Sequence, residues 1–133
     1  MEFRKTAGMF VALAGLVVVA TVSAQQAGFK RTVVQQGDLS TAGKEVVQAI
    51  AAFEPKATVG RHTHPGEEVG YVLEGSILLE MEGKPSITLT AGKGFIIPAG
   101  TIHNATNNGS GSAQVLATYI VEKGKPLATP AAK

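Results

Sequence analysis

The sequence contains no cysteine and no tryptophan, and its aromatic residues are limited to five Phe and two Tyr among 133 residues. Without cysteine the chain cannot form a disulfide, ligate an iron–sulfur cluster, build a thiolate-bound blue-copper centre or use a redox-active thiol. Its stability must therefore come from a packed core.

Charged residues are also few and nearly balanced, with 12 basic and 10 acidic residues and a net charge of +2. The sequence contains no basic cluster and has few aromatic side chains to stack on bases. These features predict that the protein does not bind nucleic acid.

The first 24 residues have the pattern of a secretory signal peptide. Arg4 and Lys5 form a positive start, an apolar run extends from Met9 to Val22, and Ser23-Ala24 completes a small-residue cleavage site. The apolar run has about 14 residues, fewer than the roughly 20 needed to span a bilayer. We therefore expect cleavage before Gln25, a periplasmic or secreted product and no stable membrane anchor after processing. An uncleaved anchor is the alternative.

The remaining chain has the length of one domain and reads as all-β. Short β-type runs alternate with turn signals, and no helical pattern stands out. The predicted strands are Thr32–Gln36, Glu45–Phe53, Val69–Leu73, Ser76–Glu82, Ser86–Thr90, Gly94–Ile97, Ile102–Thr106 and Ala113–Val121. This pattern predicts a β-sandwich or barrel over residues 25–121, followed by a flexible or loosely draped tail over residues 122–133.

All three histidines occur in two short clusters. His62 and His64 alternate along the chain, so on a strand their side chains project from one face, about 6–7 Å apart at the backbone. Pro65-Gly66 then predicts a turn that lets Glu68 face the same interior, and the turn at Pro98-Ala99-Gly100 delivers His103 from another strand. Three imidazoles and one carboxylate in a chain without cysteine predict a metal site.

The residues around the first cluster resemble the first motif of the cupin superfamily. That motif reads Gly, five residues, His-x-His, three or four residues, Glu, six residues, Gly. His62, His64, Glu68 and Gly75 keep this spacing, but Lys56 stands where the opening glycine is expected. The start of this segment is therefore expected to differ locally from the family pattern.

The second cluster resembles the second cupin motif, which reads Gly, five residues, Pro-x-Gly, two residues, His, three residues, Asn. Gly92, Pro98, Gly100, His103 and Asn107 match every position. The resemblance implies a small bacterial cupin of the conserved-barrel type, a double-stranded β-helix or jelly-roll barrel, and metal binding by His62, His64, Glu68 and His103. It also allows for a homodimer, because cupins commonly pair through sheet edges.

Alternation from Glu68 places Gly70 and Val72 on the cavity side of the strand and Glu67 on the outer side. Gly70 either leaves space beside the metal for a ligand or marks a bulge or close backbone contact. We expect the mouth of the cavity to be free of large aromatic side chains.

Three imidazoles and a carboxylate suit one divalent Fe, Mn, Ni, Cu or Zn ion per chain with open positions for a ligand. The sequence thus predicts an exported metal-binding cupin acting on a small molecule, as a dioxygenase-like enzyme or an isomerase. In either reaction Glu68 could leave the metal and act as base. The alternative is a non-enzymatic module that binds a metal or a small ligand such as a sugar.

Overall fold

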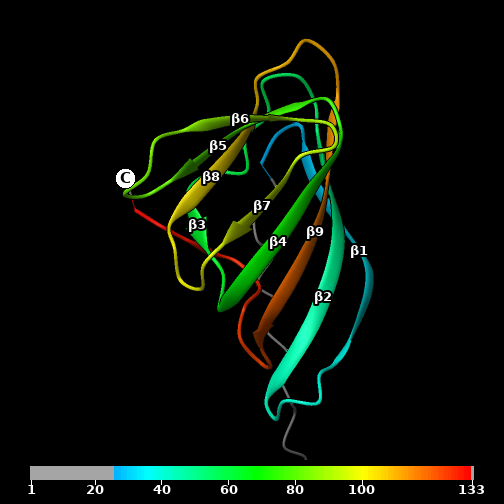
Figure 1. Ribbon diagram of the computed structural model, residues 1–133, viewed down its shortest axis with the longest axis vertical. Helices are drawn as coiled ribbons and strands as arrows, with labels where there is room; N and C mark the ends of the chain where they lie inside the picture. The colour runs from blue at the N-terminus through cyan, green and yellow to red at the C-terminus, as the bar shows by residue number, and fades with distance from the viewer. Residues whose placement is uncertain (1–25, 133) are drawn as a thin grey trace, which may run out of the picture.

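The computed structural model describes residues 26–132, and this part of the chain forms ten strands and no helix. The first sheet has the strand order β1-β2-β9-β4-β7, with bounds β1 (Phe29–Asp38), β2 (Lys44–Phe53), β9 (Ala113–Glu122), β4 (Gly66–Glu74) and β7 (Gly94–Ile97). The second has the order β10-β3-β8-β5-β6, with bounds β10 (Thr129–Pro130), β3 (His62–Thr63), β8 (His103–Asn107), β5 (Ser76–Met81) and β6 (Ile87–Thr90). Neighbouring strands are antiparallel in both sheets. Figure 1 shows the elements.

The all-β prediction is confirmed, and each of the eight predicted strands is present. The bounds differ most at two strand starts, because β1 begins at Phe29 rather than at Thr32 and β4 begins at Gly66, within the predicted Pro65-Gly66 turn, rather than at Val69. The His62–His64 segment is strand only over its first two residues, and His64 lies just after β3. The predicted leader, residues 1–24, lies outside the described residues. No helix in the described part of the chain is long and apolar enough to cross a membrane.

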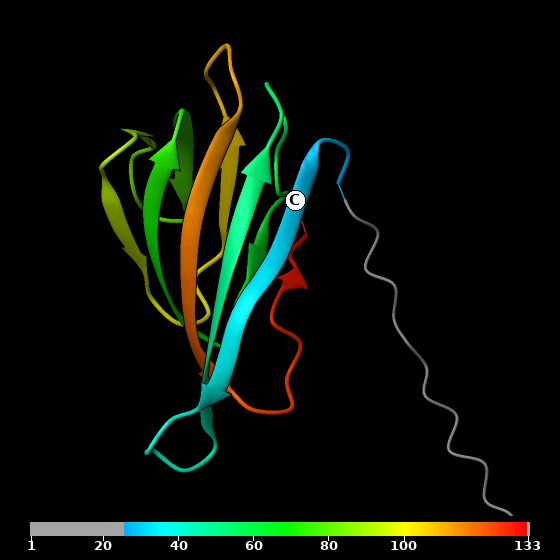
Figure 2. The same cartoon turned by 90° about the vertical axis from the view of Figure 1, so that its right-hand side faces the viewer.

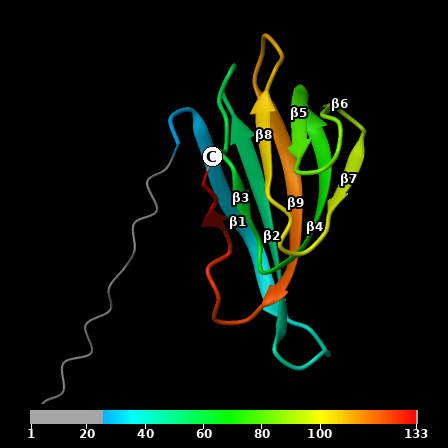
Figure 3. The same cartoon turned by 90° about the vertical axis from the view of Figure 1, so that its left-hand side faces the viewer.

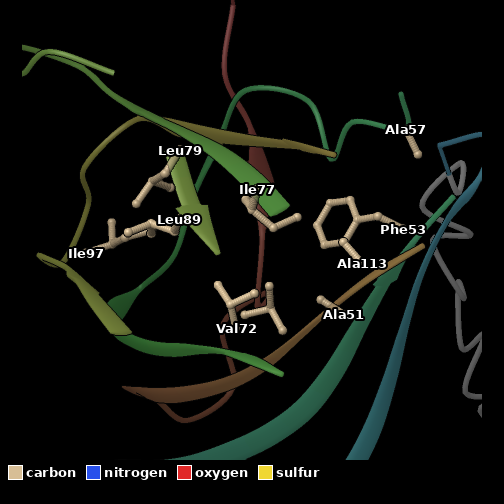
Figure 4. Packing of buried hydrophobic residues seen from close by; sticks show 10 residues of the cluster. Ala51, Phe53, Ala57, Val72, Ile77, Leu79, Leu89, Ile97 and Ala113 are labelled. Carbon is tan, nitrogen blue, oxygen red and sulfur yellow. The ribbon is translucent and has the colours of Figure 1, made fainter. Parts of the chain in front are cut away.

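The two sheets face each other and enclose the core between them (Figures 2 and 3). Buried and exposed residues alternate along β4 up to Leu73, and buried and partly buried ones alternate along all of β9, which shows which face of each strand packs inward. Phe53, Val72 and Ile77 point into this core (Figure 4). A second buried cluster, around Tyr119 and Val121, lies beside the histidines.

The segment after β9, predicted to be a loosely draped tail, returns to the barrel. Its residues Thr129 and Pro130 pair with Thr63 and His62, which adds β10 to the edge of the second sheet (Figure 3). Leu127 packs against the second buried cluster. No strand was predicted here, because a two-residue strand with one proline carries no alternation.

Candidate metal centre

The two sheets bring the three histidines and Glu68 together. His62 on β3 lies directly opposite His103 on β8, and the turn after β3 holds His64 next to both. Ligand atoms of the three histidines all lie within 4.8 Å of one another, and His62 Nε2 is 3.2 Å from His64 Nε2. All three rings are buried.

The turn predicted at residues 98–100 fixes the distance between the two histidine segments. The amide of Thr101 donates to the carbonyl of Pro98, and Gly100 at the third position has a φ of 69°. That geometry is a type II turn, which favours glycine at this position. The amide of Gly100 also donates to the carbonyl of His64, so the turn ties His64 to the segment that leads into His103.

The outer ring nitrogen of each histidine is held by a backbone carbonyl. The Nδ1 atoms of His62, His64 and His103 lie 2.7, 2.6 and 2.8 Å from the carbonyl oxygens of Gly60, Leu127 and Thr101. A carbonyl accepts but cannot donate, so each Nδ1 carries the proton. In the neutral rings every Nε2 therefore presents a lone pair to the centre, an orientation of histidine that is common around metal ions.

Glu68 faces these nitrogens from β4 of the opposite sheet. Its Oε2 lies 3.0 Å from His64 Nε2 and 3.3 Å from His103 Nε2, and Nε2 of His103 has no hydrogen-bond partner among residues 26–132. Four acceptor atoms this close repel one another unless a metal ion or a proton lies among them. His62, His64 and His103 could thus bind a metal, and the carboxylate of Glu68 completes a donor set that fits one.

Burial and charge set the protonation of two of these groups. Burial lowers the pKa of His62 to about 4, helped by the neighbouring histidines and Arg31 and opposed by the hydrogen bond to Gly60. Burial by itself would raise the pKa of Glu68, but hydrogen bonds and charge attraction from the His103 and His64 rings, which act when a ring carries a proton on Nε2, outweigh it and lower that pKa to about 2. Near neutral pH, His62 is uncharged and Glu68 is a carboxylate, the forms that ligate metals.

A small cavity adjoins the cluster between the sheets. The centres of water molecules can occupy about 30 Å³ of it, so the cavity has room for a few water molecules. Its walls are mostly apolar, with polar groups from His62, Glu68, His103, Arg31 and Tyr119.

The residues that line this cavity bear on two expectations. The freedom from large aromatic side chains expected of the mouth does not extend to the cavity itself, which Phe29, Phe53, Phe95 and Tyr119 line. Gly70 points inward as predicted, yet the space beside it is filled, because a Cβ there would lie 2.0 Å from Cζ of Phe95. Gly70 therefore makes room for the Phe95 ring rather than for a ligand.

Sequence reasoning missed Arg31 and Tyr119. The predicted first strand begins at Thr32 and so excludes Arg31, which in the structure lies on β1 with its side chain toward the cavity. Had the strand been extended to Phe29, alternation would have placed Arg31 on the cavity side. Glu67, by contrast, is exposed, as predicted.

Comparison with known proteins agrees with this architecture. Residues 49–119 match the family model of the cupin domain, which covers more than half of the chain, so the protein belongs to the cupin family. A double-stranded β-helix protein from Klebsiella pneumoniae has the same fold, with a TM-score of 0.66 and 19% identity over 80% of this chain and 87% of that one. The predicted cupin barrel is thereby confirmed.

Two relatives have named activities. Oxalate oxidase in complex with the substrate analogue glycolate has a TM-score of 0.63 and 26% identity over 77% of this chain and 54% of that one. The HTH-type transcriptional regulator PuuR of Escherichia coli is 35% identical over 77 residues, which are 57% of this chain. The match spans only 41% of PuuR, so the absence of nucleic-acid binding stays a prediction.

Proposed function

We propose that the protein is a metal-dependent cupin enzyme in which His62, His64, His103 and Glu68 hold one divalent transition-metal ion per chain. The observation that carries this proposal is the commitment of all three Nδ1–H groups to carbonyls, which leaves three Nε2 lone pairs and a carboxylate facing one point. Fe, Mn, Ni, Cu and Zn all accept such a set.

A bound ion would supply Lewis-acid polarisation of a substrate oxygen or, with Fe or Cu, a site for dioxygen chemistry. The chain contributes the rest. The apolar walls keep bulk water from the bound molecule, and the second carboxylate oxygen of Glu68 can accept a proton from it. The likeness to oxalate oxidase favours a reaction that consumes dioxygen, the class to which a dioxygenase-like reaction belongs, whereas an isomerase would use the same residues.

A non-enzymatic binding module is the second candidate. It is favoured by the lining of the cavity, to which residues 26–132 contribute one carboxylate, that of Glu68, and no lysine. If Glu68 remains on the metal throughout, no other carboxylate or lysine of the cavity can serve as a base.

We also propose that residues 1–24 direct export and are removed. Mass spectrometry of the exported protein should then find Gln25 at the N-terminus, and an intact Met1 in a membrane fraction would contradict export. The homodimer likewise stays a prediction, which light scattering on the purified protein would test.

The metal and the activity are tested together on protein purified from its native compartment. Elemental analysis should find one transition-metal ion per chain, lost in a His62→Ala, His103→Ala double variant. Oxygen consumption with a panel of small hydroxy and keto acids should depend on the metal. It should also be lost in Glu68→Gln, but not in Glu67→Gln, whose side chain is exposed. Metal binding without turnover would favour the binding module, and full metal retention in the double variant would exclude this site.

A further inference from the structure

Arg31 places a positive charge beside the histidine cluster. It lies on β1, pointing to the cavity side, with its guanidinium carbon 5.5 Å from the ring centres of both Phe29 and Tyr119. Its Nε donates a hydrogen bond of 3.2 Å to the hydroxyl of Tyr119. The two rings and this hydrogen bond hold the guanidinium in one place.

This charge has no counterion in the described part of the chain. No carboxylate among residues 26–132 forms a salt bridge with Arg31, and only its Nε–H has a hydrogen-bond partner there. The terminal N–H groups of a guanidinium match the two oxygens of a carboxylate. A partly buried cation that lines a cavity without a partner indicates an anionic ligand.

The cavity limits the size of that ligand. Space for only a few water molecules, between walls that are mostly apolar, excludes large anions such as nucleotides. His62, Glu68 and His103 line the same cavity, so a molecule that reaches Arg31 also reaches the proposed metal centre.

We propose that Arg31, supported by Tyr119, recognises the carboxylate of a small carboxylic acid. A second oxygen-bearing group of the same molecule then faces the histidine cluster. This inference rests on the proposed function and specifies its substrate class. Arg31 then acts as the specificity-determining residue, and Tyr119 positions its guanidinium.

The test compares glycolate with glycolamide, its uncharged counterpart, by calorimetric titration of the full chain loaded with Zn²⁺. Zinc does not undergo redox chemistry, so binding is measured without oxidation. Charge-assisted hydrogen bonds of this kind predict that Arg31→Gln weakens glycolate binding about 10- to 100-fold and changes glycolamide binding less than about threefold. The glycolate affinity of Arg31→Lys should lie between those of the wild-type protein and Arg31→Gln, because lysine keeps the positive charge but lacks the paired N–H donors of the guanidinium.

Two further variants separate direct recognition from a structural role. Lys30→Gln removes an exposed positive charge from the adjacent position of β1 and should leave glycolate affinity unchanged. Tyr119→Phe removes the hydroxyl that accepts from Arg31 but keeps the ring, so it should weaken glycolate binding less than Arg31→Gln does and leave glycolamide binding unchanged. Thermal unfolding of each variant establishes that it is folded, and zinc content is measured before each titration.

Wild-type affinity for glycolate in both Arg31 variants would overturn the inference, as would an equal loss for glycolate and glycolamide. A wild-type chain that binds neither probe, or prefers inorganic phosphate to glycolate, would also overturn it. Failure to load zinc would instead contradict the proposed metal centre. The same titrations of the metal-free chain would then still test whether Arg31 binds the carboxylate, because its N–H donors do not depend on the ion.

Discussion

His62 and Glu68 both release their protons more readily in the folded protein than in the unfolded chain. Burial disfavours the charged form of His62, and contact with two imidazole rings favours the charged form of Glu68. Between the folded and unfolded pKa of each group, the unfolded chain binds more protons than the folded one. Acid therefore shifts both equilibria toward unfolding.

The metal-free protein should lose stability as the pH falls. His62 has an ordinary pKa of 6.5 and a folded pKa of about 4, so its contribution is complete above pH 6.5 and is lost as the pH falls to 4. The contribution of Glu68 is complete above 4.5 and is lost as the pH falls to about 2. Urea unfolding across this range should show the decline, by about 3 kcal/mol at most for His62 alone. The decline between pH 6.5 and 4 should flatten in His62→Gln, and unchanged wild-type stability over that interval would contradict the assignment.

Gly70 is constrained by the aromatic ring beside it. A methyl group at Gly70 would lie 2.0 and 2.4 Å from Cζ and Cε1 of Phe95, so the ring must leave its place in the cavity wall. Gly70→Ala should lower the free energy of unfolding by about 1–3 kcal/mol. Gly37→Ala on β1 is the control, because nothing lies within 4 Å of its Cβ, and it should change stability by less than about 0.5 kcal/mol. Equal stability of the two variants in urea titrations would contradict this packing.

The metal-binding set could be predicted from sequence because its residues follow one another at short spacings. The His-x-His pair and Glu68 lie within seven positions, and the turn before His103 is itself encoded by proline and glycine. The cavity wall could not be predicted in the same way. Arg31 meets Tyr119, 88 positions away, because β2 pairs with both β1 and β9.

Among the connecting elements, the turn before the first histidine has a conformation that favours glycine although it contains no glycine. The amide of Ala57 donates to the carbonyl of Glu54, with Pro55 and Lys56 between them. Lys56, at the position of the missing motif glycine, has a φ of 67°. This is a type II turn, whose third position favours glycine. Asn107 holds it, donating through its amide to the carbonyls of Phe53 and Glu54.

Replacing Lys56 by glycine should therefore stabilise the protein. Glycine adopts a positive φ without the steric cost that a side chain bears there, and the expected gain is about 1 kcal/mol. The matched control is Lys84→Gly, since Lys84 is an exposed turn lysine without a positive φ, and it should be neutral or slightly destabilising. Denaturant titrations of both variants measure the difference. Loss of stability in Lys56→Gly would mean that the lysine side chain contributes more than the turn conformation.

The short strand β10 links the C-terminal segment to the metal centre. The carbonyl of Leu127, just before β10, accepts the Nδ1–H of His64. Deleting residues 123–133 removes this acceptor and the pairing of β10 with β3, so metal affinity should fall about 10- to 100-fold. Deleting only residues 132–133 leaves both contacts in place and should not change it. Competition titrations with a chelating dye measure both, and equal affinities would show that the tail has no part in the site.

In the whole molecule, the candidate metal centre joins the two sheets. His62 and His103 belong to the second sheet and Glu68 to the first, so an ion held by all of them would link the layers across the core. The unfolded chain does not hold these residues together. Ion binding is thus coupled to the packing of one sheet on the other.

Metal should consequently raise the stability of the entire domain in one transition. Free Zn²⁺ at about 100 times its dissociation constant adds about 2.7 kcal/mol, which for a domain of this size raises Tm by roughly 10–15 °C. Calorimetry with and without Zn²⁺ should show a single transition that moves by this amount. His103→Ala should largely abolish the shift. Glu68→Gln should reduce it, since the ion would then bind one sheet more tightly than the other, whereas Glu67→Gln should preserve it. A shift as large in Glu68→Gln as in the wild-type protein would show that the ion binds the histidines of the second sheet alone and does not link the layers.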